Sequence, residues 1–396
     1  MKHVYNCTGY AQKIPSITAA RGIFLSDDQG KRYMDLESGV WCTSVGHNNP
    51  RVNRVITKQI NSLTHAGYCY SHQVLEQASK AVLDAAGFDS GKCVFLCSGS
   101  EAIEISRQIS RHLSGNSISM TLHDSYLGSY SSVTDRTRNW FVFNWEQCAA
   151  CQKSSRCDSS CRVLKDIPGN ISDFIFEPGS SSGFVRFPPR ALIRILAQIV
   201  RNNNGKVIAN EVTTGIGRTG KWFGYQHYDL QPDLIAMGKG IGNGYPVSVT
   251  AISKSTMDEL EKKPFRYVQS HQNDPLGAAV ALRVIQEIRD NGLIEKAGQL
   301  GGKFLSELES LVDGQIIYAA RGRGMMLAVD LADRETAEYI HDDLIAQGYI
   351  VGNRGTTFRI DPPLIITLED FRGFVSAFKK AIAKAGNSPA REELVS

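Results

Sequence analysis

The stretch Lys206–Pro246 constrains the fold more than any other part of this chain, because it holds two short apolar runs bounded by turn residues. The runs, Lys206–Ala209 and Asp233–Met237, are typical of buried strands in a parallel sheet. The first run leads to Asn210, and the second leads to Lys239 between two glycines. In open α/β sheets, reactive groups gather at the carboxyl ends of such strands. We therefore expect this amide and this amine to face one crevice.

A lysine in that place can act as a nucleophile. Desolvation disfavours the ammonium form, so the buried amine is free near neutral pH and can attack a carbonyl group. This is what a Schiff-base lysine requires. The alternative is that Lys239 is a surface lysine in a glycine-rich turn, and the Gly-Lys-Gly triplet alone does not exclude it.

The surrounding residues decide between these alternatives through a resemblance. The strings EVTTGIGRTGKWFGYQHYDLQPD and MGKGIGNGYP resemble the core motifs of class III aminotransferases, which are fold-type I pyridoxal-phosphate enzymes. The resemblance implies an α/β fold with a mostly parallel seven-stranded sheet between helices, and a smaller α/β domain. It also makes Lys239 the Schiff-base lysine that carries pyridoxal 5′-phosphate. One position departs from the pattern, because Asn210 stands where the family has Asp.

The implied domain division is a large cofactor domain over residues 45–265 and a small domain from residues 1–44 and 266–396. Apolar runs on either side of the sequence DDQG predict a hairpin that turns at Gly30. Helices are expected to begin near Pro50 and to cover residues 72–86.

Composition limits the classes of function. The net charge is +4 and no long basic run occurs, so nucleic-acid binding is not indicated. No run reaches about 18 apolar residues, so we expect no membrane span, and the first residues, MKHVYNCTGYAQK, lack the apolar core of a secretory signal. Nine cysteines, an odd number with five of them scattered, favour reduced thiols in a cytoplasmic protein.

A strand-to-helix turn upstream predicts an anion site. The strand Cys93–Cys97 runs into Ser98, Gly99 and Ser100 and then into a helical sequence. Small residues at such a turn leave backbone N–H groups free at a helix N-terminus, where an anion can bind. The alternative is a simple N-cap with Glu101 in the first turn. The turn resembles the family's phosphate-binding turn, so Gly99 and Ser100 are assigned to the cofactor phosphate.

The resemblance assigns four further residues to the cofactor. Tyr126 matches an aromatic residue that stacks on the cofactor ring, and the alternative is a core tyrosine. Val212 is expected on the opposite ring face, and Thr213 replaces a family Gln near the ring hydroxyl. Glu177 matches a family Glu, although the loop after it, GSSSG, differs and leaves the substrate open.

Three residues are expected to act on the substrate or across a subunit boundary. Trp41 resembles a residue that walls the substrate side in ω-amine transaminases. Arg359 falls where the family clamps a substrate carboxylate, and the alternative is a structural ion pair. Ser270 matches a hydroxyl that reaches the phosphate of the neighbouring subunit, which implies a homodimer with the active site at its interface.

Four more cysteines cluster in an insertion over residues 145–161. They have the spacing C-x2-C-x5-C-x3-C and are Cys148, Cys151, Cys157 and Cys161. Four thiolates in a short segment can bind Zn²⁺ or an Fe–S cluster. The alternative is a thiol-rich surface segment without metal.

The predicted function is transfer of an amino group from an amine or amino acid to a keto acid, with Lys239 as Schiff-base residue and base. Asn210 complicates this prediction, because an amide supplies no negative charge to keep the ring nitrogen protonated. Three explanations of Asn210 are open. The position has been changed in a way that traps an intermediate, the natural reaction needs little carbanion stabilisation, or the protein no longer transaminates. The alternative functions are an epimerase or aminomutase reaction on the same scaffold, and cofactor binding with weakened catalysis.

Overall fold

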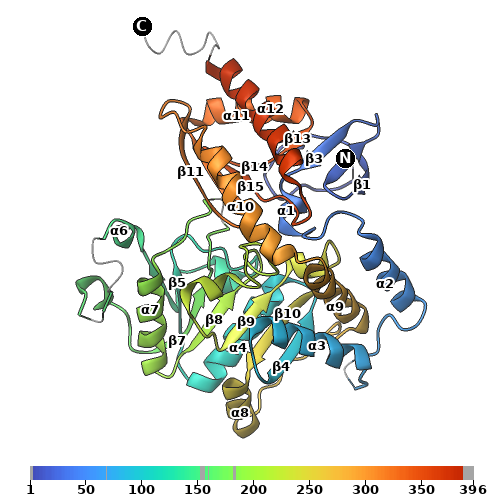
Figure 1. The fold of residues 1–396 in the computed structure, drawn as a ribbon. Helices are drawn as coiled ribbons and strands as arrows, with labels where there is room; N and C mark the ends of the chain where they lie inside the picture. The colour runs from blue at the N-terminus through green and yellow to red at the C-terminus, as the bar shows by residue number, and fades with distance from the viewer. Residues whose placement is uncertain (1–2, 68, 152–156, 159, 182–183, 387–396) are drawn as a thin grey trace.

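The computed structural model describes residues 3–67, 69–151, 157–158, 160–181 and 184–386. A large sheet with helices on both faces forms one part of the molecule. A smaller part, in which the N-terminal and C-terminal segments lie together, stands above it in Figure 1.

The large sheet has seven strands and is mostly parallel, as predicted. Its strands, in spatial order, are β4 (Gly91–Leu96), β10 (Ser248–Ser253), β9 (Leu234–Met237), β8 (Lys206–Asn210), β7 (Ile171–Phe176), β5 (Ile118–Leu122) and β6 (Trp140–Phe143). Only β10 runs antiparallel to its neighbours, β4 and β9. Every residue of β7, β8 and β9 is buried, which explains why their sequences are mostly apolar.

Helices cover both faces of this sheet (Figure 1). One face packs against α4 (Gly99–Ser114) and α8 (Lys254–Lys262). The other packs against α3 (Gln73–Ala86), α7 (Arg190–Asn202) and α9 (Pro275–Asp290), and α2 (Pro50–Ile60) packs on α9. Within β8 the side chain of Ile208 packs into the core on the sheet face that α4 and α8 cover, whereas Val207 and Ala209 pack into the core on the opposite face. This alternation is what a strand buried on both faces requires.

The smaller part holds two four-stranded sheets. One has the order β1 (Ile17–Arg21), β2 (Phe24–Asp27), β3 (Arg32–Asp35), β13 (Tyr349–Ile350), and the other β11 (Ile317–Arg323), β12 (Met326–Leu331), β15 (Thr357–Ile360), β14 (Gly352–Arg354). The predicted hairpin joins β2 to β3, and Gly30 has the positive φ of 80° that its turn requires. Because β13 pairs with β3, the two ends of the chain share one sheet.

Three long helices pack on these sheets, and stacked phenylalanines fill the core between them. The helices are α10 (Leu293–Glu309), α11 (Arg334–Ala346) and α12 (Leu368–Gly386). The rings of Phe304 on α10 and Phe371 on α12 are stacked with centroids 3.8 Å apart. The remaining short elements are α1 (Ser38–Trp41), α5 (Ser131–Thr134), α6 (Glu146–Ala149) and the 3₁₀ turns Arg162–Leu164, Gly224–Tyr228 and Lys239–Gly242.

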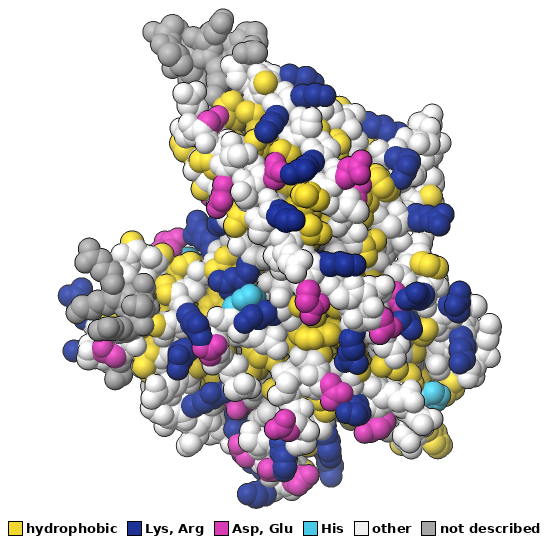
Figure 2. Space-filling view, viewed as in Figure 1, with side chains coloured by type: hydrophobic (Ala, Val, Ile, Leu, Met, Phe, Trp, Pro, Cys, Tyr) yellow, Lys and Arg dark blue, Asp and Glu magenta, His cyan; other side chains and the backbone are white. Residues whose placement is uncertain are grey.

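The surface carries charges of both signs. On the face shown in Figure 2, Lys and Arg side chains are interspersed with Asp and Glu. Among the described helices, none combines the length and the apolar character needed to span a membrane.

Candidate active site

The parallel strands place three polar side chains at one edge of the sheet. Phe176, the last residue of β7, pairs with Ala209, and Asn210 pairs with Ala236 of β9. Glu177 therefore follows β7 next to Asn210 at the end of β8. Lys239 follows β9 after Gly238, at the start of a 3₁₀ turn. The expectation that the amide and the amine face one crevice is met by a cavity that both residues line.

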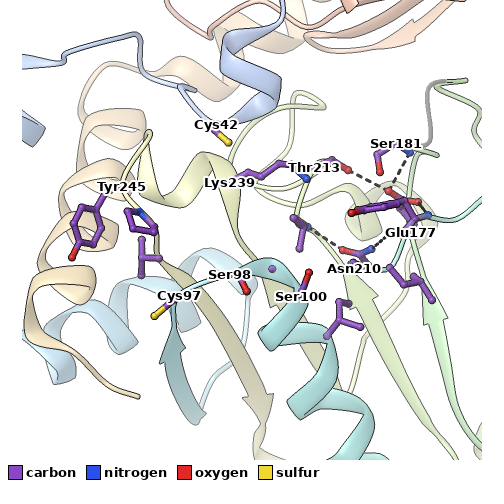
Figure 3. A pocket seen from close by; sticks show the side chains of 18 of the residues that line it. Cys42, Cys97, Ser98, Ser100, Glu177, Ser181, Asn210, Thr213, Lys239 and Tyr245 are labelled. Carbon is purple, nitrogen blue, oxygen red and sulfur yellow. Dashed lines mark hydrogen bonds between the residues drawn. The ribbon is translucent and has the colours of Figure 1, made fainter. Parts of the chain in front are cut away.

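The cavity has a volume of about 380 Å³ and collects most of the predicted cofactor residues (Figure 3). Those that line it are Gly99, Ser100, Tyr126, Glu177, Asn210, Val212, Thr213 and Lys239. Cys42, Cys97, Ser181 and Tyr245 also line it, although the sequence gave no reason to select them. Lys239 extends into the cavity between Tyr245 on one side and Glu177 with Asn210 on the other (Figure 3).

The turn at the start of α4 is an N-cap that leaves two backbone N–H groups without an acceptor among the described residues. The Ser98 hydroxyl accepts a hydrogen bond from the Glu101 N–H, and the Glu101 carboxylate accepts one from the Ser98 N–H at 2.7 Å. These side chains complete a capping box, as the simpler alternative predicted. In the described residues, nothing accepts a hydrogen bond from the N–H of Gly99 or Ser100. Both therefore face the cavity as donors at a helix N-terminus.

Tyr126 is not a core residue, since 45% of it is exposed and its ring borders the cavity. The segment that carries it is held against α4, because the Ser129 N–H donates to the Ser100 hydroxyl at 3.1 Å. Gly128 makes this approach possible. Its φ is +115°, and a Cβ there would lie 2.8 Å from the Ser100 oxygen.

Glu177 and Asn210 hold the two main-chain polar atoms of Tyr126. The Tyr126 N–H donates to Glu177 at 2.9 Å, and the Asn210 Nδ2 donates to the Tyr126 carbonyl at 2.9 Å. Glu177 also accepts from the Ser181 N–H at 3.1 Å and from the Thr213 hydroxyl at 3.4 Å. Burial raises the pKa of Glu177 to about 7, although these hydrogen bonds oppose the shift.

Lys239 has the environment of a reactive amine. Burial lowers its pKa from the ordinary value, partly opposed by Cys42 and Glu177 nearby. Its Nζ lies 5.7 Å from the centre of the Trp41 ring and 6.0 Å from that of Tyr126. Its φ of +46° is the left-handed region, which is uncommon for a residue other than glycine. The alternative of an exposed surface lysine is therefore wrong.

Trp41 and Arg359 lie beside the cavity and are not part of its lining. The Arg359 guanidinium stacks 4.2 Å from the centre of the Trp41 ring and pairs with Glu37 at 2.5 Å. Its Nε and Nη1 are buried and have no partner among the described residues. Glu37 is a residue that the sequence analysis missed. The only signal for it was an acidic residue in the string that leads to Trp41.

Trp41 is presented by a strained turn. Ser38, Gly39, Val40 and Trp41 all have left-handed φ values between 51° and 64°. For residues other than glycine this conformation costs about 1–2 kcal/mol each. The buried Arg218 helps to secure the turn, because its guanidinium contacts the Ser38 hydroxyl and donates to the carbonyl groups of Met325 and Pro362.

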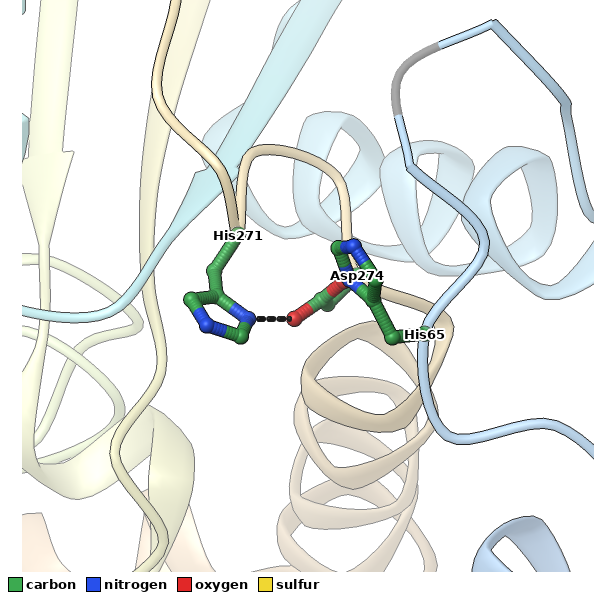
Figure 4. Close-up of side chains that lie close together, drawn as sticks. All are labelled: His65, His271 and Asp274. Carbon is green, nitrogen blue, oxygen red and sulfur yellow. Dashed lines mark hydrogen bonds and ion pairs between the residues drawn. The ribbon is translucent and has the colours of Figure 1, made fainter.

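Ser270 lies on an exposed turn away from the cavity of its own chain. His271 and Asp274 of the segment that follows Ser270 cluster with His65 from the loop between α2 and α3 (Figure 4). His271 Nδ1 contacts the Asp274 carboxylate at 2.6 Å, and His65 contacts its other oxygen. One carboxylate thus ties the loop before α3 to the turn before α9.

The four clustered cysteines are free thiols, as are the other five, within the described residues. Residues 152–156 and 159, between them, lie outside the described residues. Burial raises the pKa of Cys148 to about 11, with further contributions from Cys157, Cys161 and Cys151. Among the described residues, the group whose ligand atoms lie close enough to share an ion is His65, His271 and Asp274, and the four cysteines do not form such a group.

Comparison with known proteins identifies related chains. The family model described as aminotransferase class-III matches residues 8–382. An uncharacterised aminotransferase of Bacillus subtilis (strain 168) is 27% identical and covers 91% of this chain and 90% of its own. Acetylornithine aminotransferase of Methanopyrus kandleri is 26% identical, and the match covers 96% of this chain and 98% of that protein. The solved structure of an amine transaminase from an uncultivated Pseudomonas species, in its PLP-bound form, has a TM-score of 0.88 at 22% identity. The match covers 97% of this chain and 99% of that chain.

Gly128→Ala should destabilise the protein by about 2–4 kcal/mol, from the backbone strain and the clash with Ser100 together. Gly115→Ala is a matched control, because Gly115 also has a positive φ, of 73°, but nothing lies within 4 Å of the added Cβ. Urea unfolding of both variants should show a cost of only about 1 kcal/mol for the control. Equal costs would mean that the contact between Gly128 and Ser100 is not tight.

Proposed function

The chain belongs to the class III aminotransferases, enzymes that transfer amino groups with pyridoxal phosphate, and we propose that it moves an amino group from an amine or amino acid to a keto acid through Lys239. The observation that carries this proposal is the partly buried Lys239, which lines a cavity of about 380 Å³ at the carboxyl ends of parallel strands. Bound pyridoxal phosphate supplies an electron-withdrawing ring that stabilises negative charge at the substrate Cα.

The donor set of the cavity fits pyridoxal phosphate. The free N–H groups of Gly99 and Ser100 suit its phosphate, since a helix N-terminus favours an anion. The aromatic ring of Tyr126 and the side chain of Val212 border the cavity and suit its flat ring. Thr213 and Asn210 also line the cavity and contribute polar side chains to it. We assign these residues, with Glu177 behind Tyr126, to cofactor binding.

Lys239 has two tasks in this proposal. Burial disfavours its ammonium form, so Lys239 would hold pyridoxal phosphate at its aldehyde group through a neutral Nζ. A neutral Nζ in the cavity would also be the base that accepts the proton of the substrate Cα. The walls of the cavity, including Cys42 and Tyr245, limit the access of water to this proton transfer.

Lys239→Ala should remove amino transfer, with a loss of at least about 10³-fold in the half-reaction with amines, because it removes nucleophile and base together. Borohydride reduction and peptide mapping should locate the cofactor on Lys239 in the unchanged protein. Lys221→Ala is a control on an exposed lysine.

Mass spectrometry of the product separates the alternatives. A keto product supports amino transfer, whereas an isomer of the substrate would favour an epimerase or aminomutase. A spectrum that does not respond to a broad panel of amines would favour a cofactor-binding protein with weakened catalysis.

Arg359 is the group that we assign to the substrate carboxylate. Its Nε and Nη1 are buried donors without a partner among the described residues. They lie on different edges of the guanidinium, so a carboxylate can accept from either of them singly, and from two donors at once only together with Nη2. Glu37 already neutralises part of this charge through Nη2. The desolvated Glu37 carboxyl has a raised pKa, which Arg359 opposes. A substrate carboxylate must therefore share the guanidinium with Glu37 or displace it.

Arg359→Ala should lower kcat/KM for a keto acid by about 30- to 100-fold, since charge-assisted hydrogen bonds contribute about 2–3 kcal/mol. The loss should be much smaller for an aldehyde acceptor that lacks the carboxylate. Arg354→Ala, on the neighbouring strand β14, serves as control. Equal losses with both acceptors would show that Arg359 is a structural ion pair.

We also propose that the enzyme is a homodimer whose active site lies at the subunit interface. Ser270 supports this, because it lies on an exposed turn outside the cavity of its own chain and is available to a second copy. The resemblance assigns it to the phosphate of the neighbouring subunit.

For the cysteine cluster we propose a bound Zn²⁺ or Fe–S group that stabilises the insertion. A divalent cation would remove the electrostatic cost that Cys148 and its neighbours impose on one another when ionised. Elemental analysis of protein purified without chelators should find about one zinc ion per chain for a four-thiolate site. Cys148→Ser should lose this metal, and the control Cys69→Ser, at an exposed cysteine, should retain it. A metal-free protein would leave the cluster as a thiol-rich surface segment.

A further inference from the structure

The amide of Asn210 has only one orientation that satisfies its neighbours. Asn210 is 3% exposed, and its Nδ2 lies 2.9 Å from the Tyr126 carbonyl oxygen. Its Oδ1 accepts from the Val212 N–H at 3.3 Å. A carbonyl oxygen can only accept and a backbone N–H can only donate, so nitrogen must face Tyr126 and oxygen must face Val212.

The Asn210 contact is part of a larger arrangement that fixes the segment Tyr126–Ser129. Glu177 accepts from the Tyr126 N–H, and Asn210 donates to the Tyr126 carbonyl. The far end of the segment is tied to α4 through Ser100. The segment is thus held from the ends of β7 and β8 and from the first turn of α4. Leu127, which follows Tyr126, is buried and offers no polar side chain to a partner at position 210.

We propose that Asn210 is a positioning residue whose amide holds Tyr126 beside the cofactor ring. In this arrangement the nitrogen of the cofactor ring faces a neutral amide and not a carboxylate. The inference rests on the cofactor site proposed above. It implies that Asn210→Asp, which restores the residue type of the family motif, harms this protein instead of improving it.

An ionised carboxylate cannot take the place of the amide. It has acceptors only, so one of its oxygens would face the Tyr126 carbonyl oxygen without a hydrogen between them. The charged groups around the segment do not compensate. Glu177 is a second acid, burial lowers the pKa of Lys239 and so disfavours its charged form, and Arg136 donates to the Ser125 carbonyl at 2.7 Å. A protonated carboxyl, in contrast, has an O–H that can donate to Tyr126.

This difference gives a pH signature that needs no cofactor. A carboxyl introduced at this buried position has a folded-state pKa above the unfolded value of about 4. The folded state then binds the proton more tightly, so stability is lost as pH rises through the folded-state pKa and returns as pH falls. The Asn210→Asp protein without cofactor should therefore unfold at lower urea concentration than the unchanged protein at pH 8, with a smaller difference at pH 5.5.

Asn144→Asp is the matched control. The Asn144 side chain is exposed and accepts from the Glu146 N–H at 3.0 Å, which a carboxylate does equally well. We expect no comparable pH-dependent difference in this variant. If Asn210→Asp is as stable as the unchanged protein at pH 8, the positioning role is overturned, whatever the protein catalyses.

The holoenzyme provides the second test. Asn210→Asp should bind pyridoxal phosphate about tenfold more weakly at pH 8, the equivalent of one lost hydrogen bond, and its half-reaction with amines should not exceed that of the unchanged protein. With ¹⁵N-labelled cofactor, the ring nitrogen of the unchanged holoenzyme should resonate in the unprotonated range. A pyridinium resonance there, or a tenfold gain in rate on Asn210→Asp, would overturn the neutral-partner inference. Failure to bind the cofactor at all would instead reject the proposed function, and the stability test would still stand.

Discussion

The parallel pairing of β7, β8 and β9 is the constraint on which the rest of the site depends. Its register brings Glu177, Asn210 and the turn that holds Lys239 to one edge of the sheet, although these residues are far apart in sequence. All three strands are buried along their whole length, and the polar side chains that line the cavity follow or end these strands. The first turn of α4 opens at the same edge and adds donors for an anion.

The connection between the two parts of the molecule carries the strain. Trp41 ends a turn of left-handed residues, and Lys239 is itself left-handed. Arg218, buried between the parts, contacts the strained turn and the chain beyond β15, and burial lowers its pKa to about 10. The centre of the Trp41 ring lies 5.7 Å from the Lys239 amine and 4.2 Å from the Arg359 guanidinium. Strain of this kind persists only where surrounding contacts determine the conformation, and functional sites are where it is most often found.

The sequence predicted the parts of the site that local motifs encode. Gly99, Ser100 and Lys239 were assigned through the resemblance of two short motifs, a strand-to-helix turn and a Gly-Lys-Gly turn after a buried strand, and short motifs of this kind can be recognised without the fold. The pairing of Arg359 with Glu37 spans 322 residues and depends on how the chain ends meet, so no local pattern indicates it. The amide orientation of Asn210 was equally hidden, because its partner is a main-chain carbonyl 84 residues away. A residue type can be compared with a motif, but its hydrogen-bond partners require the fold.

The electrostatics of the site give a physical reason why a neutral residue at position 210 is tolerated. Burial raises the pKa of Glu177 and of Asp361 to about 7 each, so neither acid carries a full negative charge at neutral pH. The positive end of α4 and the guanidinium of Arg359 remain, and both attract anions. This balance favours a ligand with a phosphate and a second acidic group. A carboxylate at position 210 would weaken the attraction of the site for an anionic ligand and would lose the hydrogen bond to the Tyr126 carbonyl. The neutral amide keeps that attraction and that hydrogen bond.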